Sequence, residues 1–130
     1  MPDDYTALGT AFADAVNSGD TERVLACVDP EIRFEPLRAG TEGAFVGHEG
    51  MRRFLQDTQE SFDLFRVNIS EVIEIEDGVI GIGMLRIRGK ASGIETEVPG
   101  AAVTRFRNGL VVDFKDYGDR RKALEAAGLA

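Results

Sequence analysis

The feature that most constrains the fold of this chain is the order of its hydrophobic patterns. Helical spacing dominates the first half, and strand alternation dominates the second. From residue 67 to residue 115 the sequence predicts only strands and turns. Turn signals at Asp77-Gly78, Ala91-Ser92-Gly93 and Asn108-Gly109 divide this stretch, as in a series of hairpins. Helices followed by an antiparallel meander indicate the α+β class, with the helices packed on one face of a curved sheet.

Three helices are predicted before the meander. The first starts at the acidic N-terminal residues, carries apolar residues at helical spacing and ends at Asn17-Ser18-Gly19. The second is short: Asp20 is its N-cap, and Asp29-Pro30 stops it, because the residue before proline avoids the helical region. The third spans 47–62, and a short helix over 119–127 closes the chain.

Strands are predicted over 31–37, 67–75, 79–88 and 95–107, with a last long strand after Asn108-Gly109. A loop rich in Gly and Thr follows the first strand. Pro99-Gly100 predicts a bulge. Gly81 and Gly83 would let the long sheet curl around a cavity. We expect one domain over residues 1–130.

Composition excludes several classes of function. The net charge of -8 argues against nucleic acid and against anionic membrane surfaces, because both need clustered Lys and Arg. No apolar run approaches the roughly 18 residues of a membrane span. The acidic start Met1-Pro2-Asp3-Asp4 does not resemble a signal peptide, so we expect a cytoplasmic protein.

No metal, nucleotide or other cofactor is predicted. Cys27, the one cysteine, lies in an apolar helical context that indicates a small buried side chain. His48, the one histidine, stands at a helix start, where an exposed or capping role is expected. It has no clear partner for a metal site or a nucleophile.

Three stretches carry a family resemblance: Asn17-Ser18-Gly19-Asp20, the segment 46–54 (VGHEGMRRF) and the segment 114–119 (FKDYGD). Together they resemble the SnoaL-like branch of the nuclear transport factor 2-like superfamily, over nearly the whole chain. The resemblance implies a cone of helices and bent sheet around an apolar pocket, and a homodimer through the sheet. Family members include polyketide cyclases, ketosteroid isomerases, limonene-epoxide-type hydrolases, dehydratases and non-catalytic binding or dimerisation domains.

Two family patterns are incomplete in this sequence. Glu35-Pro36 matches the carboxylate base of ketosteroid isomerases, but Phe12 and either Ala102 or Val103 occupy the positions of the oxyanion donors. None of these side chains can donate a hydrogen bond, so an enolate would lack its main stabilisation. Of the Asp-Arg-Asp relay in limonene-epoxide-type hydrolases, Asp116 and Arg86 match, whereas Arg88 stands where the other aspartate would be.

The SnoaL-type pattern relies mainly on one acid in the last strand, and Asp116 matches it. Alternation places Asp116 on the same strand face as Val112 and Phe114, so it is a candidate general acid or base. The alternative is a salt bridge to Arg86, Arg88 or Arg105, or a solvated strand end.

Glu35 and the two arginines of the 79–88 strand are weaker candidates. Glu35 lines the pocket only if Phe34 does not pack against the helices. Arg86 and Arg88 share a face with Met84 and would either bind an anionic ligand group, hold Asp116, or pair with surface acids. The residues expected to form the core or to bind a ligand are Phe12, Val16, Phe34, Phe54, Met84, Arg88, Ala102 and Phe114.

The sequence therefore predicts a small-molecule pocket protein. Its leading interpretation is a cofactor-independent cyclase, isomerase or hydrolase that acts on an apolar, oxygenated substrate through Asp116, with Glu35 or Arg86 as the second polar group. The alternative is a non-catalytic ligand-binding or dimerisation domain. For the expected homodimer, the outer sheet face would present apolar residues such as Val103 and Val111.

Overall fold

The computed structural model describes residues 4–37 and 43–129 and confirms the α+β class. In chain order, the elements are α1 (Tyr5–Ser18), α2 (Thr21–Leu25), β1 (Val28–Glu35), β2 (Phe45–Val46), α3 (Gly47–Ser61), β3 (Phe62–Ile75), β4 (Gly78–Gly89), β5 (Glu95–Arg107), β6 (Leu110–Asp116) and α4 (Arg120–Ala126). Residues 38–42 of the predicted Gly- and Thr-rich loop lie outside the described residues, and Phe45–Val46, also predicted as loop, form the short strand β2 beside β1. None of the described helices is long and apolar enough to cross a membrane.

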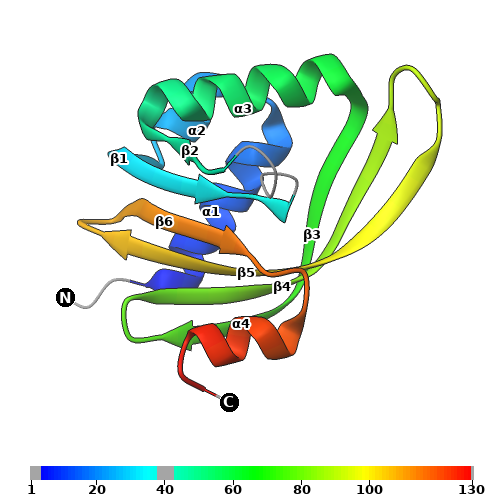
Figure 1. The fold of residues 1–130 in the computed structure, drawn as a ribbon. Helices are drawn as coiled ribbons and strands as arrows, with labels where there is room; N and C mark the ends of the chain where they lie inside the picture. Colours follow the sequence, from blue (N-terminus) through cyan, green and yellow to red (C-terminus); the bar gives the residue numbers. More distant parts are fainter. Residues whose placement is uncertain (1–3, 38–42, 130) are drawn as a thin grey trace.

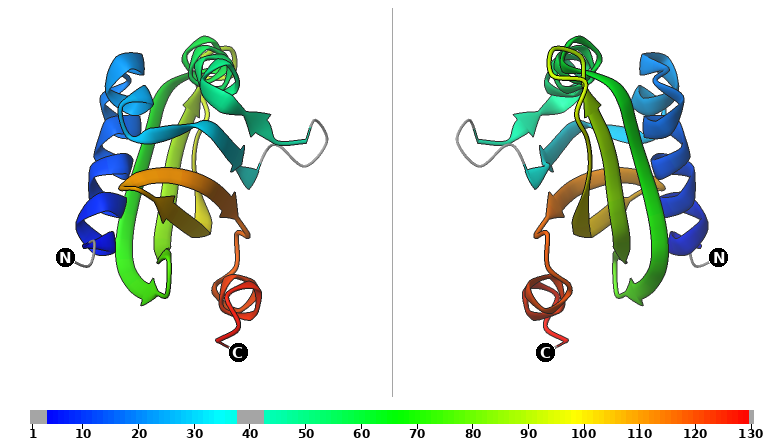
Figure 2. Two further views of the ribbon diagram at one scale, coloured as in Figure 1. Left: turned by 90° about the vertical axis from the view of Figure 1, so that its left-hand side faces the viewer. Right: turned by 90° about the vertical axis from the view of Figure 1, so that its right-hand side faces the viewer.

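The six strands form one curved, unclosed sheet in the order β2-β1-β6-β5-β4-β3. Neighbouring strands run antiparallel except β1 and β6, which are parallel. Helix α1 packs against β3 and β4, α3 packs against β1, and α4 packs against β5 and β4 from the other face (Figure 1). The side views show α1 running alongside β3, and α4 at the opposite end of the molecule from α3 (Figure 2).

Two apolar clusters hold these layers together. The larger one lies between the helices and the inner face of the sheet, and four phenylalanines pack in it ring against ring: Phe12, Phe34, Phe54 and Phe114. The smaller one lies on the outer face, where α4 packs its buried Ala123 against Ile80 and Val103.

The outer face therefore differs from the expected dimer surface. Val103 is covered by the α4 cluster, and Val111 is fully buried in the larger core. Neither residue offers apolar surface to a partner. The expectation failed for Val103 because alternation alone does not show which part of the sheet a C-terminal helix covers. It failed for Val111 because the register shift between β5 and β6 turns this residue inward.

The expected end of the second helix is also wrong. Helix α2 ends at Leu25, and Asp29-Pro30 lies within β1 instead of stopping a helix. Proline favours an extended residue before it, which suits a strand as well as a helix end. The pairing of β1 with β6 is irregular between Val28 and Arg33. The missing N–H of Pro30 therefore falls where no regular hydrogen bond of the sheet is formed.

The bulge predicted at Pro99-Gly100 does not form, because β5 pairs with β4 without interruption there. The pairing of β5 with β6 begins only at Ala102, so Pro99 lies where β5 has a single neighbour and its missing N–H costs little. The irregular pairings lie elsewhere: in β3 between Phe62 and Leu64 and between Ile69 and Glu71, and in β6 between Val111 and Asp113, opposite Arg105 and Phe106 of β5.

Gly83 makes the bend at the β3 bulge possible. A Cβ atom at this position would lie 1.9 Å from the carbonyl oxygen of Asn68, so only glycine fits. On β4, the residues Val79, Gly81, Gly83, Leu85 and Ile87 alternate onto the inner face. The small residues in the middle of this series leave space above the sheet.

Candidate functional site

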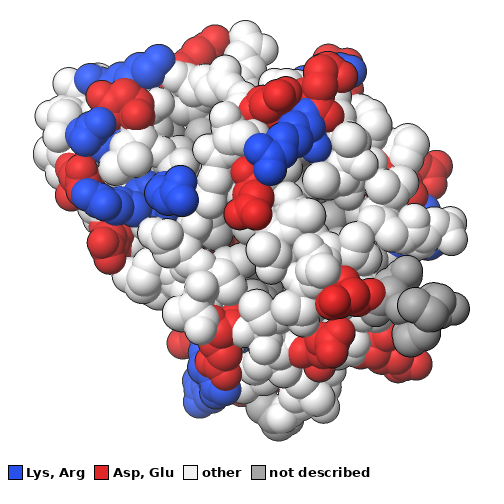
Figure 3. All heavy atoms as spheres, turned by 180° about the vertical axis from the view of Figure 1, so that it is seen from behind, with Lys and Arg blue, Asp and Glu red and all other residues white. Residues whose placement is uncertain are grey.

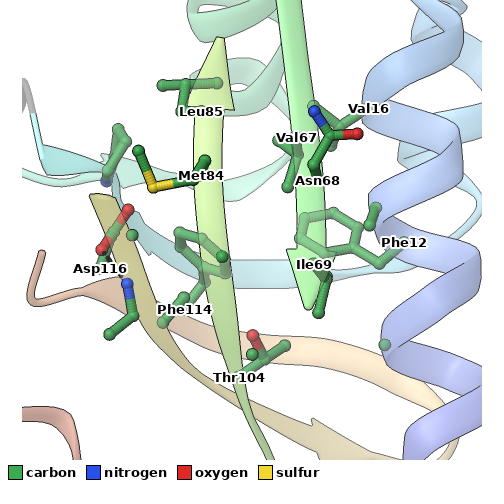
Figure 4. Close-up of a pocket in the computed structure, with 18 of the residues that line it drawn as sticks. Phe12, Val16, Val67, Asn68, Ile69, Met84, Leu85, Thr104, Phe114 and Asp116 are labelled. Atoms are coloured by element: carbon green, nitrogen blue, oxygen red, sulfur yellow. Dashed lines mark hydrogen bonds between the residues drawn. The ribbon is translucent and has the colours of Figure 1, made fainter. Parts of the chain in front are cut away.

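A cavity of about 270 Å³ occupies the space between the inner face of the sheet and the helices α1 and α3. Its wall is almost entirely apolar. The residues Phe12, Val16, Phe34, Phe54, Met84, Ala102 and Phe114, all expected to bind a ligand, line it (Figure 4). Their role in ligand binding stays a prediction.

The aromatic side of the cavity is closely packed. The ring of Phe34 stacks on Phe114 at 4.6 Å between centroids and meets Phe54 edge-on at 4.7 Å, and Phe12 packs edge-on against Phe114 at 6.0 Å. Phe12 comes from α1, Phe54 from α3, and Phe34 and Phe114 from the adjacent strands β1 and β6. The wall therefore ties four elements together, which suits a preformed pocket.

Asp116, the last residue of β6, brings a carboxylate to this cavity. Its Oδ1 accepts hydrogen bonds from the backbone N–H of Ala101 at 3.0 Å and from that of Gly118 at 2.8 Å. Gly118 has a φ of 71°, so the chain turns back toward the aspartate just after the strand. One carboxylate oxygen is thus fixed by the backbone.

The other oxygen, Oδ2, accepts no hydrogen bond from any of the residues that the structure describes. It lies over Gly100 of β5, where a Cβ atom would come within 3.3 Å of it. Glycine at this position therefore keeps the oxygen uncovered. Asp116 is the only ionisable side chain among the described residues that line the cavity.

The arginines proposed as partners of Asp116 are engaged elsewhere. Arg86 binds Glu95 at 2.6 Å, Arg88 binds Asp63 at 2.6 Å, and Arg105 pairs with Asp77. Arg86 and Arg88 project from the face of β4 opposite the cavity. The structure therefore brings neither Arg86 nor Arg88 together with Asp116.

These ion pairs shift the pKa values of the groups that form them. Hydrogen bonds from Arg86 lower the pKa of Glu95, and the Asp63 carboxylate raises the pKa of Arg88. On the face seen in Figure 3, most Lys and Arg side chains lie directly beside Asp and Glu side chains. Such mixing offers no extended basic surface for an anion.

Glu35 also lies apart from the cavity. Phe34 faces the core, so alternation turns Glu35 to the opposite side of β1, where it binds Arg33 at 2.8 Å and Lys115 at 3.5 Å. This is the solvent-facing alternative left open by the sequence. Asp116 and Glu35 do not share the pocket.

The remaining polar candidates serve the fold. The Nε2 atom of His48 lies 3.0 Å from the carbonyl oxygen of Val28 and so links the start of α3 to β1. Burial raises the pKa of the half-buried Cys27 thiol. Within 4–37 and 43–129, no three His, Cys, Asp or Glu side chains are grouped to hold a metal ion.

Four polar residues of the cavity were not singled out from the sequence: Thr6, Thr10, Asn68 and Thr104. Thr104 of β5 is only 6% exposed, and it lines the cavity beside Phe114, its cross-strand neighbour. The sequence does contain a signal, because alternation along β5 puts Thr104 on the same face as Ala102. A threonine in a strand is too common to be noticed without the cavity.

Comparisons with known proteins agree with this architecture. The family model of the SnoaL-like domain matches residues 10–114. An NTF2-like protein of unknown function from Burkholderia pseudomallei K96243 is 22% identical, with a TM-score of 0.79 over 97% of this chain and 98% of its own. No curated protein matches the sequence.

Two similar structures contain small molecules. TerC, co-crystallised with polyporic acid, is 20% identical, with a TM-score of 0.76 over 95% of this chain and 96% of its own. Rv0760c from Mycobacterium tuberculosis, in complex with estradiol-17β-hemisuccinate, is 17% identical, with a TM-score of 0.75 over 87% of this chain and 92% of its own. At these identities the likeness concerns the fold. With the family model covering most of its length, the chain belongs to the SnoaL-like family, and the similar structures show that its fold is the nuclear transport factor 2-like one.

Proposed function

We propose that this protein binds an apolar, oxygenated small molecule and catalyses a cofactor-independent proton transfer on it, with Oδ2 of Asp116 as the acid-base atom. The observation that carries the proposal is that the two oxygens of the Asp116 carboxylate have different surroundings. Oδ1 is held by two backbone N–H groups, and Oδ2 is left open over Gly100 at an apolar cavity.

The size and lining of the cavity support a small organic ligand. Its volume of about 270 Å³ is close to the lower end of the roughly 300–1,000 Å³ found for small-molecule sites. Apolar walls strengthen electrostatic interactions inside them, which favours proton transfer to a fixed carboxylate.

A single carboxylate favours some reactions over others. Cyclisation through an enolate and migration of a double bond each need one group that removes a proton and later returns it. Epoxide hydration needs water activation and protonation of the leaving oxygen, and the described lining holds no second ionisable group. We therefore favour cyclisation or isomerisation. Similar folds co-crystallised with polyporic acid or in complex with estradiol-17β-hemisuccinate support a ligand with an apolar, oxygenated ring system.

The test is hydrogen–deuterium exchange at the acidic methylene of 2-tetralone, a bicyclic ketone, followed by NMR in D₂O. The wild type is expected to accelerate exchange over protein-free buffer. Asp116→Asn is expected to return the rate to that of the buffer, because the amide oxygen can still accept both backbone hydrogen bonds while the amide nitrogen cannot take a proton. Equal rates for the two proteins would refute catalysis by Asp116.

The second candidate is a non-catalytic binding protein. It is favoured by the absence of a second ionisable side chain beside Asp116 in the described lining, which also limits the reactions that the site could catalyse. Binding of 2-tetralone to wild type and Asp116→Asn alike, with no accelerated exchange by either, would support this function instead.

We also propose a homodimer through the sheet, but through a part of its outer face that does not include Val103 or Val111. Since α4 covers Ile80 and Val103, the free part of the outer face is the end of β4 that carries Arg86 and Arg88. A monomer in light scattering at micromolar concentration would contradict it. The cytoplasmic location stays a prediction.

A further inference from the structure

Thr104 presents a hydroxyl group to the same side of the cavity as Asp116. Asp116 pairs with Ala102 across β5 and β6, and Phe114 pairs with Thr104. Thr104 and Asp116 are therefore diagonal neighbours on one sheet face, a relation that separates side chains by about 7–8 Å. Figure 4 shows both side chains directed into the cavity, with the ring of Phe114 beside them.

This hydroxyl differs from that of Thr58, the other buried threonine. The Oγ1 atom of Thr58 donates to the carbonyl oxygen of Phe54 at 2.7 Å. None of the described residues forms a hydrogen bond with Oγ1 of Thr104, yet no fully enclosed side-chain oxygen or nitrogen among them lacks a partner. The hydroxyl of Thr104 must therefore reach the cavity surface, where a bound molecule can pair with it.

We propose that Thr104 donates a hydrogen bond to the substrate oxygen on which negative charge develops while Asp116 removes a proton. This inference rests on the proposed function and deepens it. It supplies the donor that Phe12, Ala102 and Val103 cannot provide. Removal of one such donor commonly slows an enzyme by about 100- to 1,000-fold.

The step balances without a further reactant. The C–H bond next to a carbonyl breaks, its proton passes to Oδ2 of Asp116, and its electron pair moves to the carbonyl oxygen to give an enolate. Thr104 donates to that oxygen. The enolate carbon then attacks a second carbonyl of the same molecule, or it accepts the proton at another carbon, and Asp116 returns its proton to the product.

The spacing of the two groups defines the substrate class. Oδ2 must meet an acidic C–H, and Oγ1 must meet the carbonyl oxygen attached to the next carbon. A ketone held in this way spans the diagonal between the two side chains. The inference therefore specifies a neutral ketone or β-dicarbonyl compound with an apolar ring system.

The test compares Thr104→Val with the wild type in the 2-tetralone exchange reaction. Valine keeps the shape and strand preference of threonine and removes only the hydroxyl. The matched control is Thr96→Val, which makes the same change at an exposed position of the same strand, outside the cavity lining. Thermal unfolding shows that each variant folds.

We expect Thr104→Val to lower kcat for exchange about tenfold or more, with KM within about twofold, because the hydrogen bond strengthens as the enolate forms. A second readout does not require turnover. The ¹³C resonance of carbonyl-labelled 2-tetralone is expected to move downfield on binding to wild type, and this displacement is expected to shrink in Thr104→Val while Thr96→Val retains it.

The outcomes separate the two proposals. Unchanged kcat and an unchanged carbonyl resonance in Thr104→Val overturn the role of Thr104, while a difference between wild type and Asp116→Asn leaves the proposed function intact. If wild type does not exceed Asp116→Asn in exchange, the proposed catalysis fails. The carbonyl resonance then still decides whether Thr104 binds the ketone oxygen.

Discussion

Asp116 is expected to stabilise the fold through one oxygen and to act chemically through the other, and two substitutions separate these roles. Asp116→Ala removes the acceptor for the N–H groups of Ala101 and Gly118, whose distances to Oδ1 are 3.0 and 2.8 Å. Each lost hydrogen bond at this half-buried site costs about 1 kcal/mol, so the variant should lose about 2 kcal/mol of unfolding free energy. For a chain of this size that lowers Tm by about 6–8 °C.

Asp116→Asn is expected to lose less than about 1 kcal/mol, because its amide oxygen can accept both hydrogen bonds. Urea unfolding of both variants measures the difference. Asp113→Ala and Asp113→Asn are the matched controls: Asp113 lies on the same strand, and no described group hydrogen-bonds to its side chain. That pair should unfold alike. If Asp116→Asn lost as much stability as Asp116→Ala, the anchoring role of Oδ1 would be refuted.

Three further predictions concern stability: two at the frame of the cavity and one at a surface ion pair. Asn17→Ala should lower the free energy of unfolding, measured in urea, by about 1–3 kcal/mol. Nδ2 of Asn17 donates to the carbonyl oxygen of Val67 at 2.9 Å, and the N–H of Val67 donates to Oδ1 of Asn17 at 2.8 Å. Unchanged stability would show that this link between α1 and β3 is dispensable. Phe34→Ala should cost about 3–5 kcal/mol in the same assay, since it removes the centre of the aromatic cluster. A hydrogen bond from Arg120 lowers the pKa of Glu71 below the ordinary value of a glutamate carboxyl. The stability that this pair contributes is therefore present above that ordinary value and is lost as the pH falls through the folded-state pKa. Glu71→Gln should therefore weaken the loss of stability between neutral and acidic pH, measured by urea unfolding at low salt.

The parts of the fold that the sequence predicted are those determined by local chemistry. The turns at Asp77-Gly78 and Asn108-Gly109 divide the strands where expected, because the residues that adopt such turns are few. The same alternation put Asp116 and Phe114 on one face of the last strand, and both line the cavity. A periodicity of two holds where the strand is regular. It fails at a register shift, as at Val111, which was expected on the outer face and lies in the inner core.

The parts that failed depend on which face of a strand looks inward. Arg86 and Arg88 alternate correctly on β4, but the opposite face, with Gly81 and Gly83, is the one that borders the cavity. Glu35 was undecided for the same reason, and the burial of Phe34 resolves it. The two glycines indicate which face of β4 borders the cavity, since space above a sheet requires small residues on that face.

The charge of the cavity wall also limits the molecules that it can admit. The described lining contains one carboxylate and no Lys, Arg or His side chain, so a carboxylate or phosphate inside it would meet an acid without any compensating cation. The displaced Arg86 and Arg88 are held by Glu95 and Asp63 on the far face and cannot supply one. A neutral ketone avoids this penalty in the ground state and acquires negative charge only as Asp116 takes its proton, so the total charge beside the wall stays constant through the reaction. An anionic substrate would instead place two negative charges in the cavity before any proton moved. The arrangement therefore favours neutral carbon acids over organic acids as substrates.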